Sequence, residues 1–305
     1  MQPPSVVTGA FGFTGKYIAE ELLRRGERVR TLTAHPDRSS PLFSRVEVAP
    51  LEFSSVEALA QSMEGAKVLY NTYWIRFAYG KVNHARAVEN SRILIQAAET
   101  AGVERVVHIS ITNPSPHAST PYFRGKAAVE EAILSSKLSH AILRPALLFG
   151  EGDILINNIA WLLRHCPIFA VPGSGDYALQ PIFVEELATL ATDAGRGRDN
   201  VIVHAVGPET YTYSELVRLI RAAVGSRSHL VHVPAWMVPT LIQPLNWMLN
   251  DVLLTSDELR ELTENVLVAE GQPAGHASFR RWLEGHADTV GKRYASELDR
   301  HYRRG

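Results

Sequence analysis

Three glycines at three-residue spacing near the start of the chain constrain its fold more than any other feature. Gly9, Gly12 and Gly15 lie in "VTGAFGFTGKYIAEELL" (residues 7–23), between an apolar β-branched run and an amphipathic segment. Glycine permits a tight turn after a strand and lets the N–H groups that open the next helix approach a pyrophosphate closely. The motif therefore predicts a dinucleotide-binding turn between a first strand and a first helix.

A Walker A phosphate loop is a different glycine-rich turn, and the sequence does not fit it. Ala10 stands at the first glycine position of that motif. Tyr17 replaces the Ser or Thr that would bind Mg²⁺. We therefore expect a dinucleotide rather than a nucleoside triphosphate.

Short β-branched runs alternate with helical patterns through the first half of the chain, which is typical of βαβ units around a parallel sheet. The expected strands lie in "SVVTG", "RVRTLT", "RVEVAP", "KVLYNTY", "RVVHISI" and "HAILRPALLF". We predict an α/β fold: a doubly wound, parallel Rossmann-like sheet with a smaller, mostly helical C-terminal substrate domain. The dinucleotide-binding domain is expected at 1–150 plus about 178–207, and the substrate or partner domain at about 151–177 plus 208–305.

The balance of charge excludes some classes of partner. The 305 residues include 31 Lys and Arg against 32 Asp and Glu, which gives no overall electrostatic footprint for nucleic acid or anionic lipid. A single cysteine, Cys166, excludes an intramolecular disulfide and suits a reducing compartment. The first five residues carry no basic segment of a signal peptide, so we expect a cytoplasmic protein.

The most apolar late stretch is "AWMVPTLIQPLNWMLNDVLL" (residues 235–254). Pro239, Pro244 and two asparagines interrupt it, and a membrane span needs about 20 mainly apolar residues. We expect a helix pair that is buried or faces a partner, and no transmembrane segment. A homodimer, or a protein partner bound through the C-terminal helices, is left open.

A tyrosine and a lysine at helical spacing form the candidate catalytic pair. Tyr122 and Lys126 follow a Pro-rich loop and stand one turn apart on an expected helix. The ammonium can stabilise the phenolate, so that the tyrosine passes protons near neutral pH. The hydroxyl of Thr112, at the preceding strand end, would polarise a substrate carbonyl. The alternative is an exposed helix pair without chemistry.

The end of the second strand bears on the choice of coenzyme. An acid there would bind the adenosine ribose, and a cation would accept a 2′-phosphate. Thr33, His35 and Arg38 could hold a phosphate, whereas the nearby Asp37 follows Pro36 in the turn. These residues favour NADP(H) over NAD(H), and the alternative is that they merely solvate a loop.

The motifs together resemble the extended and atypical short-chain dehydrogenase/reductase superfamily: "TGAFGFTG", the strand end at Ser110 and Thr112, "YFRGK" and "RPALLFG". "VHISITNPS", "YFRGKAAVE" and "GDYALQPIFVEELA" are similar to its branch with the complex I accessory subunit of the NDUFA-nine type and related epimerase/dehydratase-like proteins. The resemblance implies Tyr122 as acid and base, and Lys126 on the nicotinamide ribose. Ala34 departs from the arginine that many relatives place there for the 2′-phosphate.

The same resemblance implies that residues 71–73 and 52–53 line the adenosine half of the coenzyme and that residues 145–148 pass beside the nicotinamide. The expected cofactor-binding residues are Gly9, Phe11, Gly12, Phe13, Thr14, Gly15, Thr33, His35, Arg38, Glu52, Phe53, Asn71, Thr72, Tyr73, Ser110, Tyr122, Lys126, Pro145, Ala146 and Leu148. No paired histidine spacing suggests a metal site, and His108 is expected to be a satisfied core residue. The aromatic cluster at residues 70–79 is either a wall of the substrate cleft or core packing.

These patterns predict an NAD(P)(H)-dependent oxidoreductase that acts on a small carbonyl or alcohol. One alternative is a non-catalytic dinucleotide-binding protein with a structural or redox-sensing role. A further alternative is a nucleotide-sugar epimerase or dehydratase, which would use the same Tyr-Lys chemistry.

Overall fold

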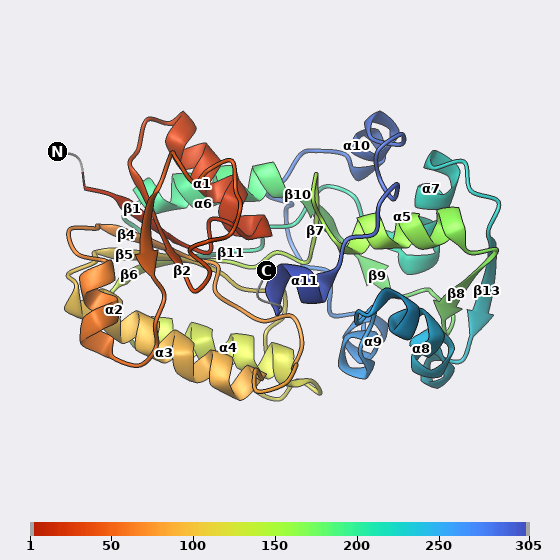
Figure 1. The fold of residues 1–305 in the computed structure, drawn as a ribbon, viewed down its shortest axis with the longest axis horizontal. Coiled ribbons are helices and arrows are strands. Elements are labelled where there is room, and N and C mark those ends of the chain that lie inside the picture. Colours follow the sequence, from red (N-terminus) through yellow and green to blue (C-terminus); the bar gives the residue numbers. More distant parts are fainter. Residues whose placement is uncertain (1–2, 303–305) are drawn as a thin grey trace. The chain divides into compact units, whose positions relative to one another are not determined.

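The computed structural model describes residues 3–302 and divides the chain into two units (Figure 1). Unit 1 comprises Met1–Pro145 and Val184–Ala205, and unit 2 comprises Ala146–Phe183 and Val206–Gly305. Each unit has its own hydrophobic core. The glycine motif and the Tyr-Lys pair both lie in unit 1.

A seven-stranded sheet with parallel pairing throughout forms the centre of unit 1. Its order is β11-β6-β5-β4-β1-β2-β3, which confirms the predicted Rossmann-like sheet. The strands are β1 (Ser5–Thr8), β2 (Val29–Thr33), β3 (Glu47–Pro50), β4 (Val68–Asn71), β5 (Arg105–Ile109), β6 (Ser139–Leu143) and β11 (Val201–Val203). The strand order reverses between β1 and β4, and ligands of open parallel sheets bind at such a switch point.

Helices cover both faces of this sheet (Figure 1). The helices of unit 1 are α1 (Phe13–Arg24), α2 (Val56–Ser62), α3 (His84–Thr100), α4 (Pro121–Leu134) and α6 (Val184–Arg196). The pair α1 and α6 lies on one face, and α2, α3 and α4 lie on the other. Buried side chains such as Leu69, Leu94 and Ile133 join β4, α3 and α4 in one core.

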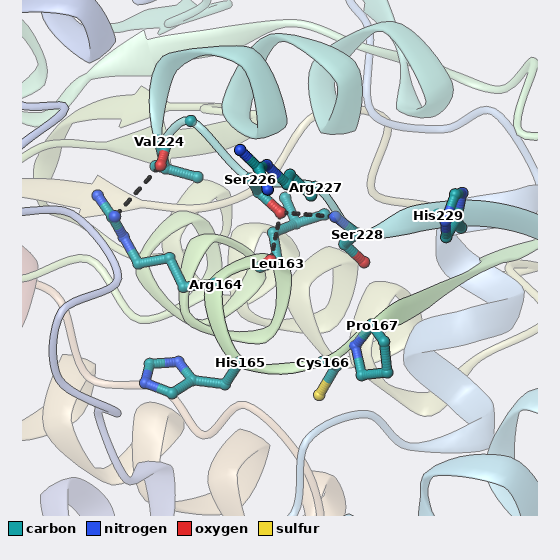
Figure 2. A pocket seen from close by; sticks show the side chains of 11 residues that line it. Leu163, Arg164, His165, Cys166, Pro167, Val224, Ser226, Arg227, Ser228 and His229 are labelled. Carbon is teal, nitrogen blue, oxygen red and sulfur yellow. Dashed lines mark hydrogen bonds between the residues drawn. The ribbon is translucent and has the colours of Figure 1, made fainter.

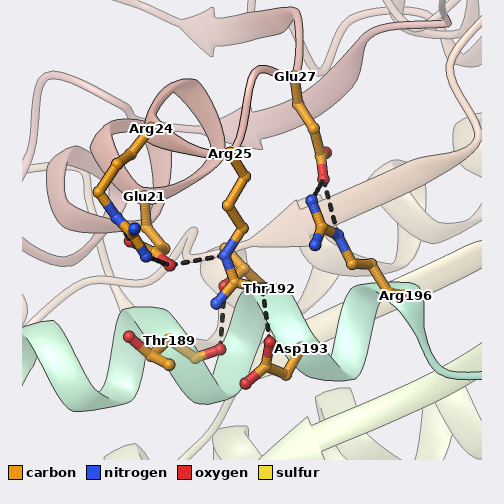
Figure 3. A network of polar contacts seen from close by, with 8 residues as sticks. All are labelled: Glu21, Arg24, Arg25, Glu27, Thr189, Thr192, Asp193 and Arg196. Carbon is orange, nitrogen blue, oxygen red and sulfur yellow. Dashed lines mark hydrogen bonds and ion pairs between the residues drawn. The ribbon is translucent and has the colours of Figure 1, made fainter.

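Ion pairs hold α6 against α1, although α6 begins only after the chain returns from unit 2 (Figure 3). Arg25 is the C-cap residue of α1. Its guanidinium donates to Glu21 of α1 at 2.6 Å and to Asp193 of α6 at 2.5 Å. Arg196 donates to Glu27 at 2.9 Å. Such partly exposed pairs contribute about 0.2–1 kcal/mol each, so they orient α6 more than they stabilise the unit.

The segment "HAILRPALLF", expected as one strand, forms two strands in different sheets. β6 ends at Leu143, and β7 (Leu147–Phe149) pairs with β10 (Pro181–Phe183) in unit 2. The Arg144 N–H still bonds to the Val203 carbonyl, whereas Pro145 has no N–H with which to extend the ladder. The chain therefore leaves the central sheet at this proline.

Unit 2 packs helices around small sheets. Its remaining strands are β8 (Ile168–Pro172), β9 (Ala178–Leu179), β12 (Tyr211–Thr212) and β13 (His229–Val233). Its helices are α5 (Leu155–His165), α7 (Tyr213–Ala223), η1 (Ala235–Met237), α8 (Val238–Leu249), α9 (Ser256–Thr263), α10 (Phe279–Gly285) and α11 (Glu297–His301). The core gathers apolar side chains of α5, α7 and α10 around Phe149 and Phe279.

The apolar stretch at residues 235–254 does not form a buried helix. Only Val238 of α8 is buried, so the first of the two expected alternatives, burial within the chain, is wrong for this helix, and the partner-facing alternative stays a prediction. Pro239 is accommodated because the first helical turn needs no intrahelical N–H bond. Among the described residues, no helix has the length and apolar character required to cross a membrane.

Candidate functional site

The turn between β1 and α1 requires its glycines for two different reasons. Gly9 has a φ of +68°, a left-handed conformation that side chains with a Cβ rarely adopt. A Cβ on Gly15 would lie 2.3 Å from the Gly9 carbonyl oxygen and 2.7 Å from its carbon. These contacts are with backbone, which cannot rotate away. Gly15 therefore lets α1 start directly against the end of β1.

The start of α1 fits a pyrophosphate. Gly12 is the N-cap residue, its N–H bonds to the Gly9 carbonyl at 2.8 Å, and no side-chain hydrogen bond caps the helix. The first N–H groups of a helix have no intrahelical acceptor, and the helix dipole makes this end positive. No acidic residue occupies the first turn. The residues Phe11, Phe13 and Thr14 share this turn, which fits a dinucleotide.

The ends of β1 and β4 are tied together beside this turn. The Thr72 N–H donates to the Thr8 hydroxyl oxygen at 2.7 Å, and the Thr72 hydroxyl donates to the Thr8 carbonyl at 2.5 Å. Asn71 is fully buried, and its side-chain oxygen accepts from the Tyr73 N–H at 3.0 Å. These bonds fix the strand ends of the switch point, where the sequence predicted the adenosine half of the coenzyme.

Aromatic rings extend this edge. The Phe53 and Tyr73 ring centroids are 4.9 Å apart, and the Tyr73 hydroxyl accepts from the Asn90 amide at 2.8 Å. Burial raises the pKa of Tyr73, so its phenol stays neutral. Glu52, next to Phe53, is exposed. The ring contact thus joins Phe53, which follows β3, to Tyr73, which follows β4.

The loop after β2 places the residues predicted for a 2′-phosphate. Thr33 is buried, and its hydroxyl oxygen accepts from the His35 N–H at 3.0 Å, so the hydroxyl shapes the loop. His35 is exposed. Arg38 is half-buried, and that burial lowers the pKa of its guanidinium. Of the three residues predicted for the 2′-phosphate, Arg38 is the one that carries a permanent positive charge.

Tyr122 and Lys126 stand on consecutive turns of α4, which begins at Pro121 after the N-cap Thr120. Lys126 is only 3% exposed. Its ammonium donates to the Ile109 carbonyl at 2.8 Å and lies 4.9 Å from the centre of the Trp74 ring. Burial lowers the pKa of Lys126 to about 7, and the nearby Glu130 carboxylate opposes that shift.

Trp74 is a neighbour of the candidate Tyr122-Lys126 pair that sequence reasoning did not single out. A Cβ on Gly125 would lie 2.7 Å from the Trp74 ring, so the glycine of "YFRGK" makes room for this indole. The Tyr122 ring centroid is 5.8 Å from those of both Trp74 and His84. The aromatic cluster at 70–79 therefore divides: Tyr70 is core, and Trp74 packs beside Tyr122. The available signal was a glycine inside the helix, three residues after Tyr122.

Ser110 is held by a buried ionic network. Its hydroxyl donates to Glu130 at 2.5 Å, and Arg144 binds the same carboxylate at 3.0 and 2.5 Å. Glu130 is 3% exposed. The network connects β5, α4 and the end of β6, so the Ser110 hydroxyl has a structural partner. From the sequence, the one available indication of a role for Glu130 was its position one helical turn beyond Lys126.

The other predicted residues near the pair are placed as follows. Thr112 is fully buried, and its N–H donates to the Pro145 carbonyl at 2.8 Å. Ala146 and Leu148 lie in unit 2, before and within β7. Unit 1 thus holds the predicted catalytic residues and most of the predicted coenzyme residues.

His108 is a core residue, as expected, but it is not satisfied. It is fully buried beside Asn71 on the neighbouring strand, and neither ring nitrogen has a hydrogen-bond partner within residues 3–302. Burial, and then the charge of Lys126, lowers the pKa of His108 well below its usual value. The imidazole is therefore neutral at physiological pH and adds no charge beside Lys126.

The stability of the coenzyme-free protein should depend on pH through Lys126. The folded pKa is about 7 against 10.5 for an ordinary lysine, so the unfolded chain binds the extra proton between these values. Unfolding free energy should then rise with pH, by about 1 kcal/mol per unit above pH 7. We expect Lys126→Met to be more stable than wild type at pH 7 and to lose about 2 kcal/mol of that advantage by pH 9. Urea unfolding measures this; parallel pH curves for the two proteins would contradict it.

A serine substitution separates structural from binding roles at the strand end. Ser110→Ala should lower the unfolding free energy by about 1–2 kcal/mol, because Glu130 loses a buried donor. Coenzyme affinity should change less than about twofold, since a lost contact to coenzyme would cost more. Thermal unfolding and fluorescence titration with NADPH and NADH check both values, with exposed Ser54→Ala as the control. A large loss of affinity at unchanged stability would assign Ser110 to the coenzyme instead.

Comparison with known proteins agrees with this geometry. A model of NAD(P)H-binding proteins matches residues 9–156. Subunit 9 of the mitochondrial NADH dehydrogenase (ubiquinone) 1 alpha subcomplex of Arabidopsis thaliana is 24% identical over 87% of this chain and 71% of its own. The ceramide reductase of Caulobacter vibrioides is 26% identical over 75% of this chain and 73% of its own.

A solved structure shares the fold. The triphenylmethane reductase of Citrobacter sp., crystallised with NADP(H), has a TM-score of 0.72 and 18% identity, covering 93% of this chain and 99% of that one. Fold and glycine turn together define an NAD(P)-binding Rossmann protein of the extended short-chain dehydrogenase/reductase superfamily. Within it, the chain is similar to the epimerase/dehydratase-like branch that includes the complex I accessory subunit of the NDUFA-nine type.

Proposed function

We propose that the chain is an NAD(P)(H)-dependent oxidoreductase that interconverts a carbonyl and an alcohol. The observation that carries the proposal is Tyr122 one turn from the buried amine of Lys126 on the same helix. Both residues belong to the unit that contains the dinucleotide turn. The ceramide reductase relative adds lipid-borne carbonyls to the small carbonyls predicted from sequence.

In this proposal, the N–H groups at the start of α1 bind the pyrophosphate, and Gly15 keeps that helix end in place. When bound, the nicotinamide coenzyme supplies or accepts the hydride. Tyr122 gives its phenolic proton to the substrate oxygen in reduction and removes it in oxidation. Lys126 stabilises the phenolate by its charge, and the Thr112 hydroxyl orients the substrate oxygen.

The direct test is turnover. Oxidation of NADPH and NADH is followed over a panel of aldehydes, ketones and long-chain keto lipids, together with mass spectrometry of ligand released from freshly purified protein. We expect a bound nicotinamide dinucleotide and at least one substrate whose reduction scales with enzyme concentration. Failure to bind either coenzyme at millimolar concentration would end the proposal.

We further propose NADP(H) as the preferred coenzyme. Arg38 is half-buried, so its charge has lost part of its hydration, and a 2′-phosphate would offset that loss. Arg38→Ala should weaken NADPH binding about tenfold and leave NADH binding nearly unchanged. Calorimetry with both coenzymes measures this, with exposed Arg45→Ala as the control. Equal losses for the two coenzymes would contradict a role at the 2′ position.

A second candidate function is coenzyme binding without turnover, in a structural or redox-sensing role. Its support is specific: the Lys126 ammonium already donates to the Ile109 carbonyl and faces the Trp74 ring. One relative of this chain is a subunit of the mitochondrial NADH dehydrogenase (ubiquinone), which fits a role within a larger assembly. Tightly held, unreacted coenzyme across the whole panel would favour this function over the first.

A further inference from the structure

Helix α8 of unit 2 leaves a large apolar surface exposed. Trp236 of η1 is 78% exposed, and Trp247, Met248 and Leu241 of α8 are 87%, 64% and 46% exposed. Val238, the buried residue of this helix, lies nine residues before Trp247 and therefore on the opposite side of the helix. We call Trp236, Leu241, Trp247 and Met248 the apolar surface. A tryptophan stands at each end of it.

The balanced charge of the whole chain hides a local imbalance around this surface. Residues 225–250 contain no Asp or Glu, whereas Arg227, His229 and His232 are all exposed. The next carboxylate, Asp251, is buried and accepts from the Tyr294 hydroxyl and the Glu297 and Leu298 N–H groups. The next exposed acidic residue is Asp257 of α9, so α9 marks the end of the segment without exposed carboxylates.

Basic side chains, two arginines and two histidines, line a pocket at the start of β13. The pocket has a volume of about 560 Å³ and lies between the ends of α5 and α7 (Figure 2). Arg164, His165, Arg227 and His229 line it, and the described residues that line it include no carboxylate. Arg164 turns toward the Val224 carbonyl and bonds to it at 3.2 Å. β13 then leads directly from His229 to η1 and the apolar surface.

Area and chemistry limit what covers the apolar surface. Its side chains expose roughly 500–600 Å², because each tryptophan contributes about 200 Å². A stable protein interface buries about 800 Å² of total surface on each partner, so these four side chains alone would not complete one. Tryptophan rings favour the boundary between headgroups and acyl chains, and phosphates complement the acid-free segment.

We propose that β13, η1 and α8 dock unit 2 on the surface of a phospholipid bilayer. The apolar surface enters the headgroup and acyl boundary, as amphipathic interfacial helices do. The exposed Arg227 guanidinium, beside the imidazole of His229, faces lipid phosphates. α8 has 12 residues with Pro244 inside, so it lies on the bilayer rather than crossing it. The docking does not depend on whether the chain turns over a substrate.

Vesicle flotation of the full chain tests the proposal. The vesicles are phosphatidylcholine alone, and an equimolar mixture with phosphatidylglycerol. We expect binding to both, stronger to the mixture, and a blue shift of tryptophan emission on binding. The double variant Trp236→Gln/Trp247→Gln should bind at least about tenfold more weakly to both vesicles. Arg227→Ala should weaken binding about fivefold to the anionic vesicles only.

A matched control uses exposed apolar residues of unit 1. Leu134 and Ile202 are 49% and 44% exposed, and Leu134→Gln/Ile202→Gln should bind like wild type. Both exchanged tryptophans are exposed, so the melting temperatures should agree. The proposal is overturned if the wild type floats with neither vesicle, or if the tryptophan variant floats equally well. It is also overturned if sedimentation equilibrium shows a wild-type dimer that the tryptophan variant dissociates.

Discussion

Replacement of Gly15 by alanine should weaken coenzyme binding by about a hundredfold or more. The new Cβ would stand 2.3 Å from the Gly9 carbonyl oxygen and 3.1 Å from that of Thr8, so the start of α1 must move away from β1. Such a shift removes at least two charge-assisted N–H contacts to a pyrophosphate, each worth about 1.5–3 kcal/mol. Overpacking should also lower the unfolding free energy by about 1–3 kcal/mol. Calorimetric titration and urea unfolding measure the two effects.

Two other glycines separate this clash from general effects of the substitution. Gly26 has a φ of +78° but no atom within 4 Å of the Cβ that alanine would add, so Gly26→Ala tests conformational strain alone. Gly285 has neither a positive φ nor a close atom, so Gly285→Ala should be nearly neutral. Both variants should bind coenzyme like wild type. If Gly15→Ala also binds normally, the turn between β1 and α1 is not the pyrophosphate site.

The fold was predictable because its signals are local. Gly9 and Gly15 are needed for contacts within a few residues of themselves, and the β-branched runs of the central strands β1 and β5 mark strands that are buried on both faces of the sheet. Likewise, Tyr122 and Lys126 share a helix face because their spacing alone decides it. Periodicity does not mark where a strand stops, so the expected strand ran past Pro145, which has no N–H with which to extend the ladder.

The surroundings of the candidate pair depend on contacts that spacing does not encode. Glu130 reaches both Ser110 and Arg144, which are 20 and 14 residues away. Trp74 reaches Gly125 across the gap between two βα units. Neither partnership leaves a periodic pattern. Helix α8 is a different case. Its apolar composition suggested burial, but an apolar helix is buried only where another surface packs against it.

Replacement of Tyr122 by phenylalanine should reduce turnover by about a thousandfold while coenzyme affinity changes less than about threefold. Phenylalanine keeps the ring that packs 5.8 Å from Trp74 and from His84, so the local packing survives and only the acidic O–H is lost. The rate is measured on the best substrate of the carbonyl panel, and affinity by titration. Tyr79→Phe, at a tyrosine that is 43% exposed, is the matched control and should retain the wild-type rate.

The pair of measurements also separates the two candidate functions. If Tyr122→Phe turns over at the wild-type rate, the phenol does not move the proton, and the substrate must obtain it elsewhere. If the wild type binds coenzyme tightly and reduces nothing on the panel, then Lys126, bonded to the Ile109 carbonyl, serves the fold rather than a reaction. In that outcome Lys126→Met should bind coenzyme as wild type does, because a lysine used only in packing adds nothing to the coenzyme contacts.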